Sequence, residues 1–190
     1  MDESQEVALI RHCQSGDKKS FRNLVEQYDS ALFGTAYLMT RDRSLAEDAV
    51  QEALIKIWKN LPTFRFKSSI KTWMIRIVVN EVKQQFRKKQ VPTISLEILP
   101  EIAGGTDQSL DNIILDEKRR NLRQAMDKLS YQHKEVLVLR FFSELTVPEI
   151  AAVTSQREGT IKSRLSRALG NLRQILYEAN EGEGRFNDNE

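Results

Sequence analysis

Cysteine, glycine and long apolar runs are scarce in this chain of 190 residues. The single cysteine, Cys13, excludes an internal disulfide framework and a zinc site built from cysteines. Eight glycines and a 7% aromatic content do not favour a turn-rich β-sandwich or a glycine-rich nucleotide loop. No run of about 18 apolar residues is present, and the first residues, MDESQE, are acidic, so we expect neither a membrane span nor a secretory signal. These absences favour a helical protein of the cytoplasm.

Charge is distributed unevenly along the chain, although the net charge is only +2. Residues 1–89 carry 16 basic and 11 acidic side chains, and residues 118–175 carry 12 and 5. Between them, residues 90–117 hold six acids and no base. Two basic segments separated by an acidic one indicate two surfaces for polyanions and a connection that a polyanion repels, although ordinary solubilising charge gives the same pattern.

The acidic segment also divides the chain into domains. It contains two of the four prolines and the pair Gly104 and Gly105, and it lacks a sustained helical period. We therefore predict an all-α fold of two small helical domains joined by a flexible acidic linker. The predicted boundaries are a first domain over 1–89, the linker over 90–116, a second domain over 117–177 and a disordered tail over 178–190.

Apolar residues of the first domain recur at helical spacing. The stripe from Phe21 to Met39 predicts one long helix, and Ser44 with Glu47 predicts a capping box that opens a second helix ending near Pro62. This second helix is either solvated on its outer face or docks a partner helix there. The residues on that face, which the predicted core does not use, are Asp48, Gln51, Glu52 and Ile55.

A third helix, predicted over about residues 69–89, is apolar on one side and basic on the other. Lysine and arginine neutralise phosphates and an asparagine amide can pair with a base edge, so the basic side suits nucleic acid, unless it is simply solvated. It carries Arg76, Asn80, Lys83 and Arg87. The preceding loop mixes aromatic and cationic side chains, which either stack on unpaired bases or plug a core. Its residues are Phe64, Arg65, Phe66, Lys67 and Ser68.

The most specific local signal lies in the second domain. Thr146 and Glu149 form a capping box with Pro148 in the first turn, so a short helix begins there. It breaks at residues 154–157, and a further amphipathic helix follows, which predicts a helix-turn-helix or else a plain helical hairpin. The second helix presents short donors and then long cations, as a major-groove helix needs. Its outward residues are Thr160, Lys162, Ser163, Arg164, Ser166 and Arg167.

Several segments resemble the bacterial RNA polymerase sigma factors. LAEDAVQEALIKIWKNLPTF is similar to their second conserved region, and KTWMIRIVVNEVKQQFRK resembles the promoter-reading helix that follows it. Residues 129–173 resemble the fourth region, and this order with a short linker is typical of the extracytoplasmic-function (ECF) subfamily. The similarity extends from about residue 17 to 176. The sequence departs from the family in the turn, where Ser155 replaces a frequent glycine and Gln156 a common aliphatic residue.

The resemblance implies a transcription initiation factor and not an enzyme, with no cofactor and no metal. The implied partners are promoter DNA, the clamp helices of the largest RNA polymerase subunit, the flap of the second largest subunit, and an anti-sigma factor. Asp48, Gln51, Glu52 and Ile55 would contact the clamp helices. Phe64 to Ser69 would capture a flipped base of the minus-ten element, and the basic side of the following helix would track that strand. The minus-thirty-five element would be read by Arg157, Glu158, Thr160, Lys162, Ser163, Arg164 and Arg167.

Two other functional classes stay open at this point. One is a stand-alone regulator whose N-terminal helices dimerise or sense an effector. The other is a nucleic-acid-modifying enzyme, although the chain contains no P-loop, no HExxH motif and no nucleophile elbow. Transcription in vitro with purified core polymerase distinguishes these classes from an initiation factor, because only an initiation factor directs the polymerase to a specific start.

The linker length suggests a dependence on polymerase. As a flexible coil, the 27 residues from 90 to 116 span roughly 30 Å. Promoter elements about two helical turns apart are on the order of 70 Å distant along B-DNA. We therefore expect that polymerase holds the linker extended and that the free protein binds duplex promoter poorly.

Overall fold

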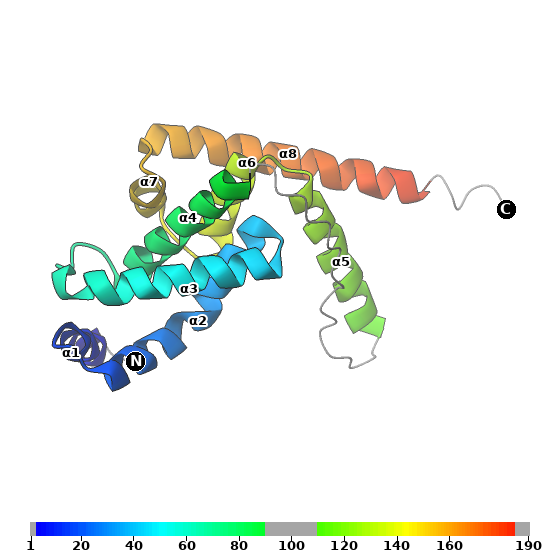
Figure 1. The fold of residues 1–190 in the computed structure, drawn as a ribbon. Coiled ribbons are helices and arrows are strands. Elements are labelled where there is room, and N and C mark those ends of the chain that lie inside the picture. The colour runs from blue at the N-terminus through cyan, green and yellow to red at the C-terminus, as the bar shows by residue number, and fades with distance from the viewer. Residues whose placement is uncertain (1–2, 90–109, 185–190) are drawn as a thin grey trace.

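The computed structural model of the protein describes residues 3–89 and 110–184, and every regular element in these ranges is helical. The first group of helices is α1 (Glu3–Gln14), α2 (Lys18–Thr40), α3 (Arg43–Asn60), the 3-10 turn η1 (Leu61–Thr63) and α4 (Ile70–Lys89). The second group is α5 (Leu110–Asp127), α6 (Tyr131–Leu137), the π-helical turn η2 (Val138–Phe142), α7 (Val147–Thr154) and α8 (Glu158–Gly184). The predicted all-α fold of two helical domains is confirmed (Figure 1). None of the described helices has the length and apolarity that crossing a membrane requires.

Local capping explains where α2 and α3 begin. The Asp17 carboxylate accepts hydrogen bonds from the backbone N–H groups of Lys19 and Ser20, which starts α2. The chain leaves α2 through Arg41 in the left-handed region, and this turn brings Asp42, not Ser44, to the cap of α3. Asp42 accepts from the backbone N–H of Leu45 at 3.0 Å. The predicted Ser44 capping box is therefore wrong by two residues.

The helices of the second domain extend beyond the residues predicted for that domain. The first helix of that domain, α5, begins at Leu110, inside the predicted linker, and α8 continues to Gly184, inside the predicted disordered tail. Gln174 donates a hydrogen bond of 2.7 Å to Glu178 one turn later, which supports the extended end of α8. The rest of the predicted linker, 90–109, and of the predicted tail, 185–190, lies outside the described residues.

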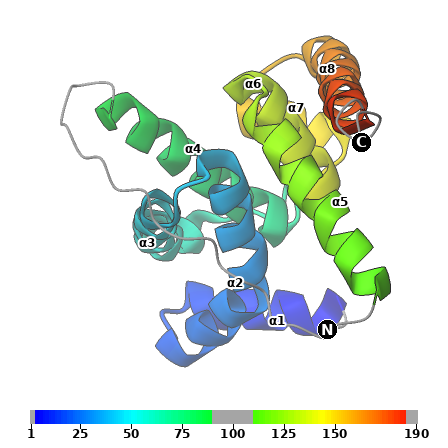
Figure 2. The same ribbon diagram turned by 90° about the vertical axis from the view of Figure 1, so that its right-hand side faces the viewer.

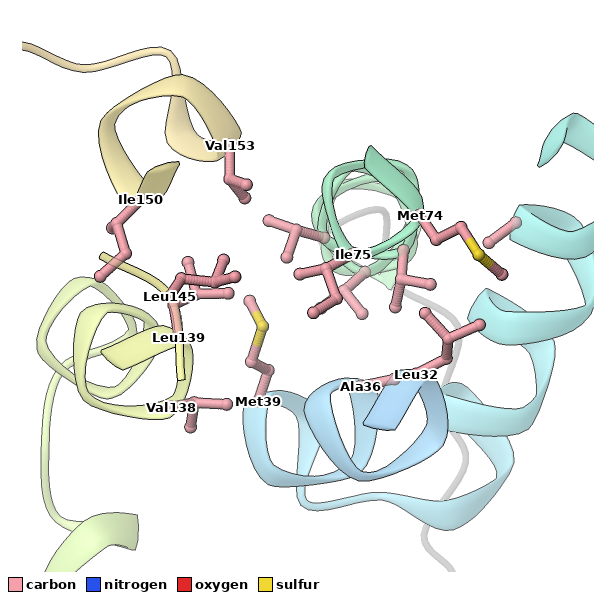
Figure 3. Packing of buried hydrophobic residues seen from close by; sticks show 14 of the residues in the cluster. Leu32, Ala36, Met39, Met74, Ile75, Val138, Leu139, Leu145, Ile150 and Val153 are labelled. Carbon is pink, nitrogen blue, oxygen red and sulfur yellow. The ribbon is translucent and has the colours of Figure 1, made fainter. Parts of the chain in front are cut away.

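The two groups of helices lie side by side (Figure 2). In this arrangement α7 packs on α4, and η2 packs on α2. Their buried residues form one continuous core. Met39 of α2 points toward Val138 and Leu139, and Ile75 of α4 lies on the side facing Val153 of α7 (Figure 3). Burial of this apolar surface is the main favourable term that holds the domains together.

Polar contacts accompany the apolar ones between the domains. Lys83 of α4 lies 2.8 Å from a carboxylate oxygen of Glu135 on α6. The hydroxyl of Thr72 on α4 donates to Glu149 on α7 at 2.8 Å. Gly34 of α2 leaves room for the ring of Phe142, whose nearest atom would be 2.2 Å from a Cβ at that position. Further cross-domain pairs are Thr35 with Ser143, Arg41 with Asp127 and Lys71 with Glu144.

Candidate functional site

The predicted docking residues share the outer face of α3. This α3 face consists of Asp48, Gln51, Glu52 and Ile55, and all of them are exposed. Ile55 is 49% exposed, so it offers an apolar contact at the surface between the two acids. Within the described part of the chain, neither Asp48 nor Glu52 pairs with a cation. The structure thus presents two free carboxylates around an apolar side chain.

A shallow groove of about 420 Å³ lies next to the α3 face, between α2 and α3. Phe21 and Trp58 meet in it with their ring centroids 4.9 Å apart. Lys18 and Arg22 lie on its α2 side and Leu54 on its α3 side. An apolar floor beside a charged face is the form of surface that accepts an amphipathic helix.

The segment from Phe64 to Ser69, which we call the aromatic loop, connects η1 to α4. Its two phenylalanines behave differently, because Phe64 is only 7% exposed and packs against Trp73 with the ring centroids 5.2 Å apart. Phe66 is 43% exposed and lies over Phe64 at 5.0 Å. The backbone of Phe66 has a φ of 55°, a strained value for an aromatic residue. Phe64 therefore plugs the core, and Phe66 offers its ring to the surface beside the exposed Arg65, Lys67 and Ser68.

Only part of the predicted basic side of α4 is exposed. Arg76, Asn80 and Arg87 are exposed along one stripe. Lys83, from the same stripe, turns toward the second domain and forms its ion pair with Glu135, whose side chain is only 4% exposed. A carboxylate buried to this extent needs a partner charge, so Lys83 is committed to Glu135 in this arrangement.

Tyr131 lies beside this ion pair at the start of α6. Its hydroxyl is buried and has no hydrogen-bond partner among the described residues. Burial, followed by the negative charge of Glu135, raises the pKa of Tyr131 well above its ordinary value. The phenol therefore stays neutral, and Lys83 is the cation that balances Glu135.

The helix-turn-helix forms as predicted. Thr146 and Glu149 make the reciprocal capping box of α7, with the Thr146 backbone N–H donating to Glu149 at 2.9 Å. Burial alone would raise the pKa of Glu149, but hydrogen bonds from Thr146 and Thr72 outweigh it and hold the pKa below its ordinary value. Ser155 adopts the left-handed conformation with a φ of 56°, so the turn forms without the glycine that the family often has.

The N-terminal half of α8 presents the predicted reading residues. Ile161 and Ala168 are fully buried and fix which side of the helix faces inward. Thr160 and Arg164 are half-buried at the edge of this side. The remaining predicted residues are exposed: Arg157, Glu158, Lys162, Ser163 and Arg167.

The basic residues of both domains approach each other across a groove of about 710 Å³, the interdomain groove. Lys83 and Arg87 of α4 line one side, and Arg164 of α8 lines the other. Tyr131 and Glu135 of α6 also line it. The sequence reasoning missed Glu135 and the apolar pair Ile75 and Val79, which the second domain covers. Ile75 and Val79 adjoin the basic side of α4, and their apolar character signals that this flank is covered without showing which element covers it.

The sequence matches two family models, Sigma-70 region 2 over residues 24–91 and Sigma-70, region 4 over residues 119–172. The RNA polymerase sigma-H factor of Pseudomonas aeruginosa is 30% identical over 179 residues, which cover 88% of this chain and 92% of the relative. The ECF RNA polymerase sigma-E factor of Haemophilus influenzae is 30% identical over 172 residues, covering 85% and 89%. A solved complex of the sigma factor RpoE with the anti-sigma factor NepR from Bartonella quintana has a TM-score of 0.65 and 29% identity, covering 84% of this chain and 98% of that one.

These matches confirm the resemblance found in the sequence, and they cover both helical domains described above. The chain therefore belongs to the ECF family of RNA polymerase sigma factors, the initiation factors that direct RNA polymerase to specific promoters.

Proposed function

We propose that three surfaces divide the work of this initiation factor. The α3 face binds core RNA polymerase, the aromatic loop and the basic side of α4 bind the melted minus-ten strand, and the N-terminal half of α8 reads the minus-thirty-five element. The observation that carries this assignment is the exposed, strained Phe66 directly before a helix with a basic stripe. The factor supplies specificity and leaves the chemistry of RNA synthesis to the polymerase, so we assign it no catalytic residue.

The α3 face suits a basic helical partner. Asp48 and Glu52 offer unpaired carboxylates, Ile55 offers an apolar contact, and the half-buried Phe21 and Trp58 line the neighbouring groove. Such a combination gives both electrostatic steering and a desolvated centre. The clamp helices of the largest polymerase subunit are the proposed occupant.

The aromatic loop suits capture of a base that has left the stack. Flipping a base costs a few kcal/mol, and stacking on an aromatic side chain returns about 1–3 kcal/mol. Phe66 supplies the exposed ring, and Arg65 and Lys67 supply charge for the adjoining phosphates. Arg76, Asn80 and Arg87 continue the path along α4. No nucleotide hydrolysis is needed for this step.

Reading a whole promoter requires the domains to separate. Lys83 and Arg87 face Arg164 across one groove, whereas promoter elements two helical turns apart are on the order of 70 Å distant. The packed arrangement therefore represents the free factor. On promoter binding, Lys83 exchanges the Glu135 carboxylate for a phosphate of the DNA backbone. The flap of the second largest subunit is the proposed partner that keeps the second domain apart from the first.

An anti-sigma factor is a further proposed partner. The Bartonella quintana sigma factor was solved in complex with its anti-sigma factor NepR, and that sigma factor shares the fold of this chain. Copurification from the native cell tests the proposal. A small protein should accompany the factor and be displaced as polymerase subunits bind. A factor that copurifies with polymerase alone under every growth condition would contradict it.

Transcription in vitro tests the function itself. Purified core polymerase with this chain and a genomic template library should produce discrete transcript starts that core polymerase alone does not produce. A stand-alone regulator would instead protect a duplex site without polymerase, and an enzyme would turn over a nucleic-acid substrate. Either of these results, without discrete starts, would refute the assignment.

A further inference from the structure

A side chain from α1 holds the start of the aromatic loop. The Nε2 amide of Gln14 donates one hydrogen bond to the carbonyl of Leu61 at 3.1 Å and another to the carbonyl of Phe64 at 2.9 Å. We propose that Gln14 is a positioning residue for minus-ten recognition, because it fixes the backbone from which Phe66 projects. This inference rests on the proposed function of the aromatic loop.

Gln14 is itself held firmly in place. It is the last residue of α1, in which Ile10 and Cys13 are buried against the rest of the domain. Burial raises the pKa of the Cys13 thiol to about 11, so this side chain stays neutral and acts as an apolar anchor. Tyr28 of α2 donates a hydrogen bond to Glu6 near the other end of α1.

The turn after α1 adds a second constraint. Gly16 has a φ of 91°, a conformation that glycine adopts without strain, and the next residue, Asp17, caps α2. The connection between α1 and α2 is therefore short, and its Gly16 and Asp17 backbone N–H groups donate to carbonyls in the last turn of α1. Gln14 cannot drift relative to the domain core without breaking this turn.

The chemistry of the contact requires an amide. Nε2 of glutamine carries two N–H donors, which match the two backbone carbonyls, whereas a carboxylate at the same place would only accept. The Leu61 carbonyl also accepts from the backbone N–H of Phe64 at 3.0 Å, which closes η1. Gln14 thus ties together the turn and the first residue of the loop.

The far end of the aromatic loop is held by a different contact. The Ser69 hydroxyl accepts from the backbone N–H of Thr72 at 3.1 Å at the start of α4. Residues 65–68 are exposed between these two anchors. The left-handed backbone of Phe66 persists only where its surroundings enforce it, and Gln14 supplies the anchor on one side. The match to Sigma-70 region 2 begins at residue 24, after both α1 and Gln14.

The test uses holoenzyme reconstituted with full-length factor and a promoter fragment found by the transcription assay. The fragment is a fork junction whose minus-ten non-template strand is unpaired, and it is prepared with either a normal nucleotide or an abasic site at the captured position. The readout is the affinity for the fragment with the normal nucleotide divided by the affinity for the abasic fragment. A general loss of stability lowers both affinities and leaves this ratio unchanged.

The variant is Gln14→Met, which keeps the length of the side chain and removes both donors. We expect the ratio to fall by about 3- to 10-fold, the effect of one or two net hydrogen bonds on loop position. Gln14→Glu should lower it further, because a carboxylate repels the two carbonyls. Gln124→Met is the matched control, since Gln124 is an exposed glutamine on α5 far from the loop. Polymerase affinity should change by less than about twofold in all three.

Phe66→Ala distinguishes a failure of the Gln14 positioning role from a failure of the proposed function of the aromatic loop. If Phe66→Ala lowers the ratio and Gln14→Met does not, the positioning role is wrong and the proposed function of the loop stands. If neither changes the ratio, the proposed function fails and the inference fails with it. Hydrogen exchange adds a second test: the Phe64 backbone N–H, which closes η1, should exchange faster in Gln14→Met than in the unmodified factor, and equal rates would overturn the anchor.

Discussion

Left-handed backbone at residues other than glycine marks four positions in the described ranges: Arg41, Phe66, Glu144 and Ser155. At Ser155 the conformation serves the turn of the helix-turn-helix, and the side chain is exposed. A Cβ in this region costs an L-residue about 1–2 kcal/mol, and glycine avoids this cost but loses about 0.5–1 kcal/mol through the entropy of the unfolded chain.

Ser155→Gly should therefore stabilise the protein by roughly 0.5–1 kcal/mol. The measurement is the free energy of unfolding in urea. Ser166→Gly provides the control, because Ser166 is an exposed serine in the middle of α8, where glycine weakens the helix. Equal destabilisation by both changes would show that the left-handed conformation of Ser155 carries no strain.

The carboxylates of the α3 face make a prediction about polymerase. Changing both Asp48 and Glu52 to Lys should weaken binding to core polymerase at least about tenfold, because two attractive contacts with a basic helix become repulsive. Binding is measured by fluorescence anisotropy, and circular dichroism checks the fold. Changing Asp29 and Glu117 to Lys gives the same change in net charge on other exposed positions. Unchanged affinity of the first variant would remove the α3 face from the docking assignment.

Arg164 makes a prediction about promoter specificity. Arg164→Ala should cost about 1–3 kcal/mol of holoenzyme binding and relax discrimination at one base pair of the minus-thirty-five element, if this side chain grips a guanine. Affinities for duplexes with single base changes provide the measurement. A loss that is uniform over all sequences would instead identify Arg164 as a phosphate contact.

The sequence alone could not show which phenylalanine of the aromatic loop is exposed. Phe64 and Phe66 alternate with cations in the same loop, and only the fold shows that Phe64 is buried and Phe66 exposed. The pattern predicts that the loop contains aromatic rings, whereas the contact with Trp73 and the left-handed turn at Phe66 decide which ring faces outward. Gln14 was missed for a related reason, because its partners are backbone carbonyls 47 and 50 residues away.

At the scale of the element, α7 combines a local cap with a contact between domains. Glu149 accepts from Thr146 within its own capping box and from Thr72 of α4. Its pKa is lower in the folded protein than the ordinary value of 4.5. The stability that its charge contributes is therefore complete above the unfolded pKa and is lost as the pH falls through the folded pKa.

Glu149→Gln should consequently be less stable than the unmodified protein at pH 7. Glutamine keeps the shape of a capping box but not the charge, so the difference should close as the pH falls through the lowered pKa of Glu149. Urea unfolding at several pH values between about 7 and 3 measures the gap. A gap that stays constant over this range would show that the ionised carboxylate plays no part.

The sequence predicts a helix start correctly where only one residue nearby is suited to cap the helix. Thr146, Pro148 and Glu149 specify the start of α7 without ambiguity. Before α3, both Asp42 and Ser44 are good cap residues, and the turn at Arg41 decides between them. The end of α8 was missed because its composition is that of a tail.

At the scale of the whole molecule, the notable feature is the contact between the domains. The sequence predicts both domains and their order, but not that Ile75 and Val79 of α4 are covered by the second domain. A single apolar stripe predicts one buried face of a helix. Helix α4 is buried on two sides, by its own domain and by the second domain, so the stripe describes only part of its packing. Met39 likewise joins the long stripe of α2 but extends into the shared core.

Separation of the domains should be visible by energy transfer. With labels at Asn60→Cys and Ser166→Cys, transfer should fall when core polymerase and promoter bind the free factor. Cys13 is buried and stays unlabelled. Transfer that is unchanged on promoter binding would contradict the separation.

The same labels test the ion pair between the domains. Lys83→Gln should lower transfer in the free factor, because it leaves Glu135 without its cation. Lys88→Gln, at an exposed position on the same helix, should leave transfer unchanged.

The shared core of the two domains also has a thermal consequence. Opening it transfers Met39, Ile75, Val79, Leu139 and Val153 from an apolar environment to water, unless polymerase covers them. Such a step carries a positive heat capacity, and the apolar attraction that opposes it weakens on cooling. The population of free factor with its domains apart should accordingly be larger in the cold, which makes growth temperature a physical input to how readily this protein engages polymerase.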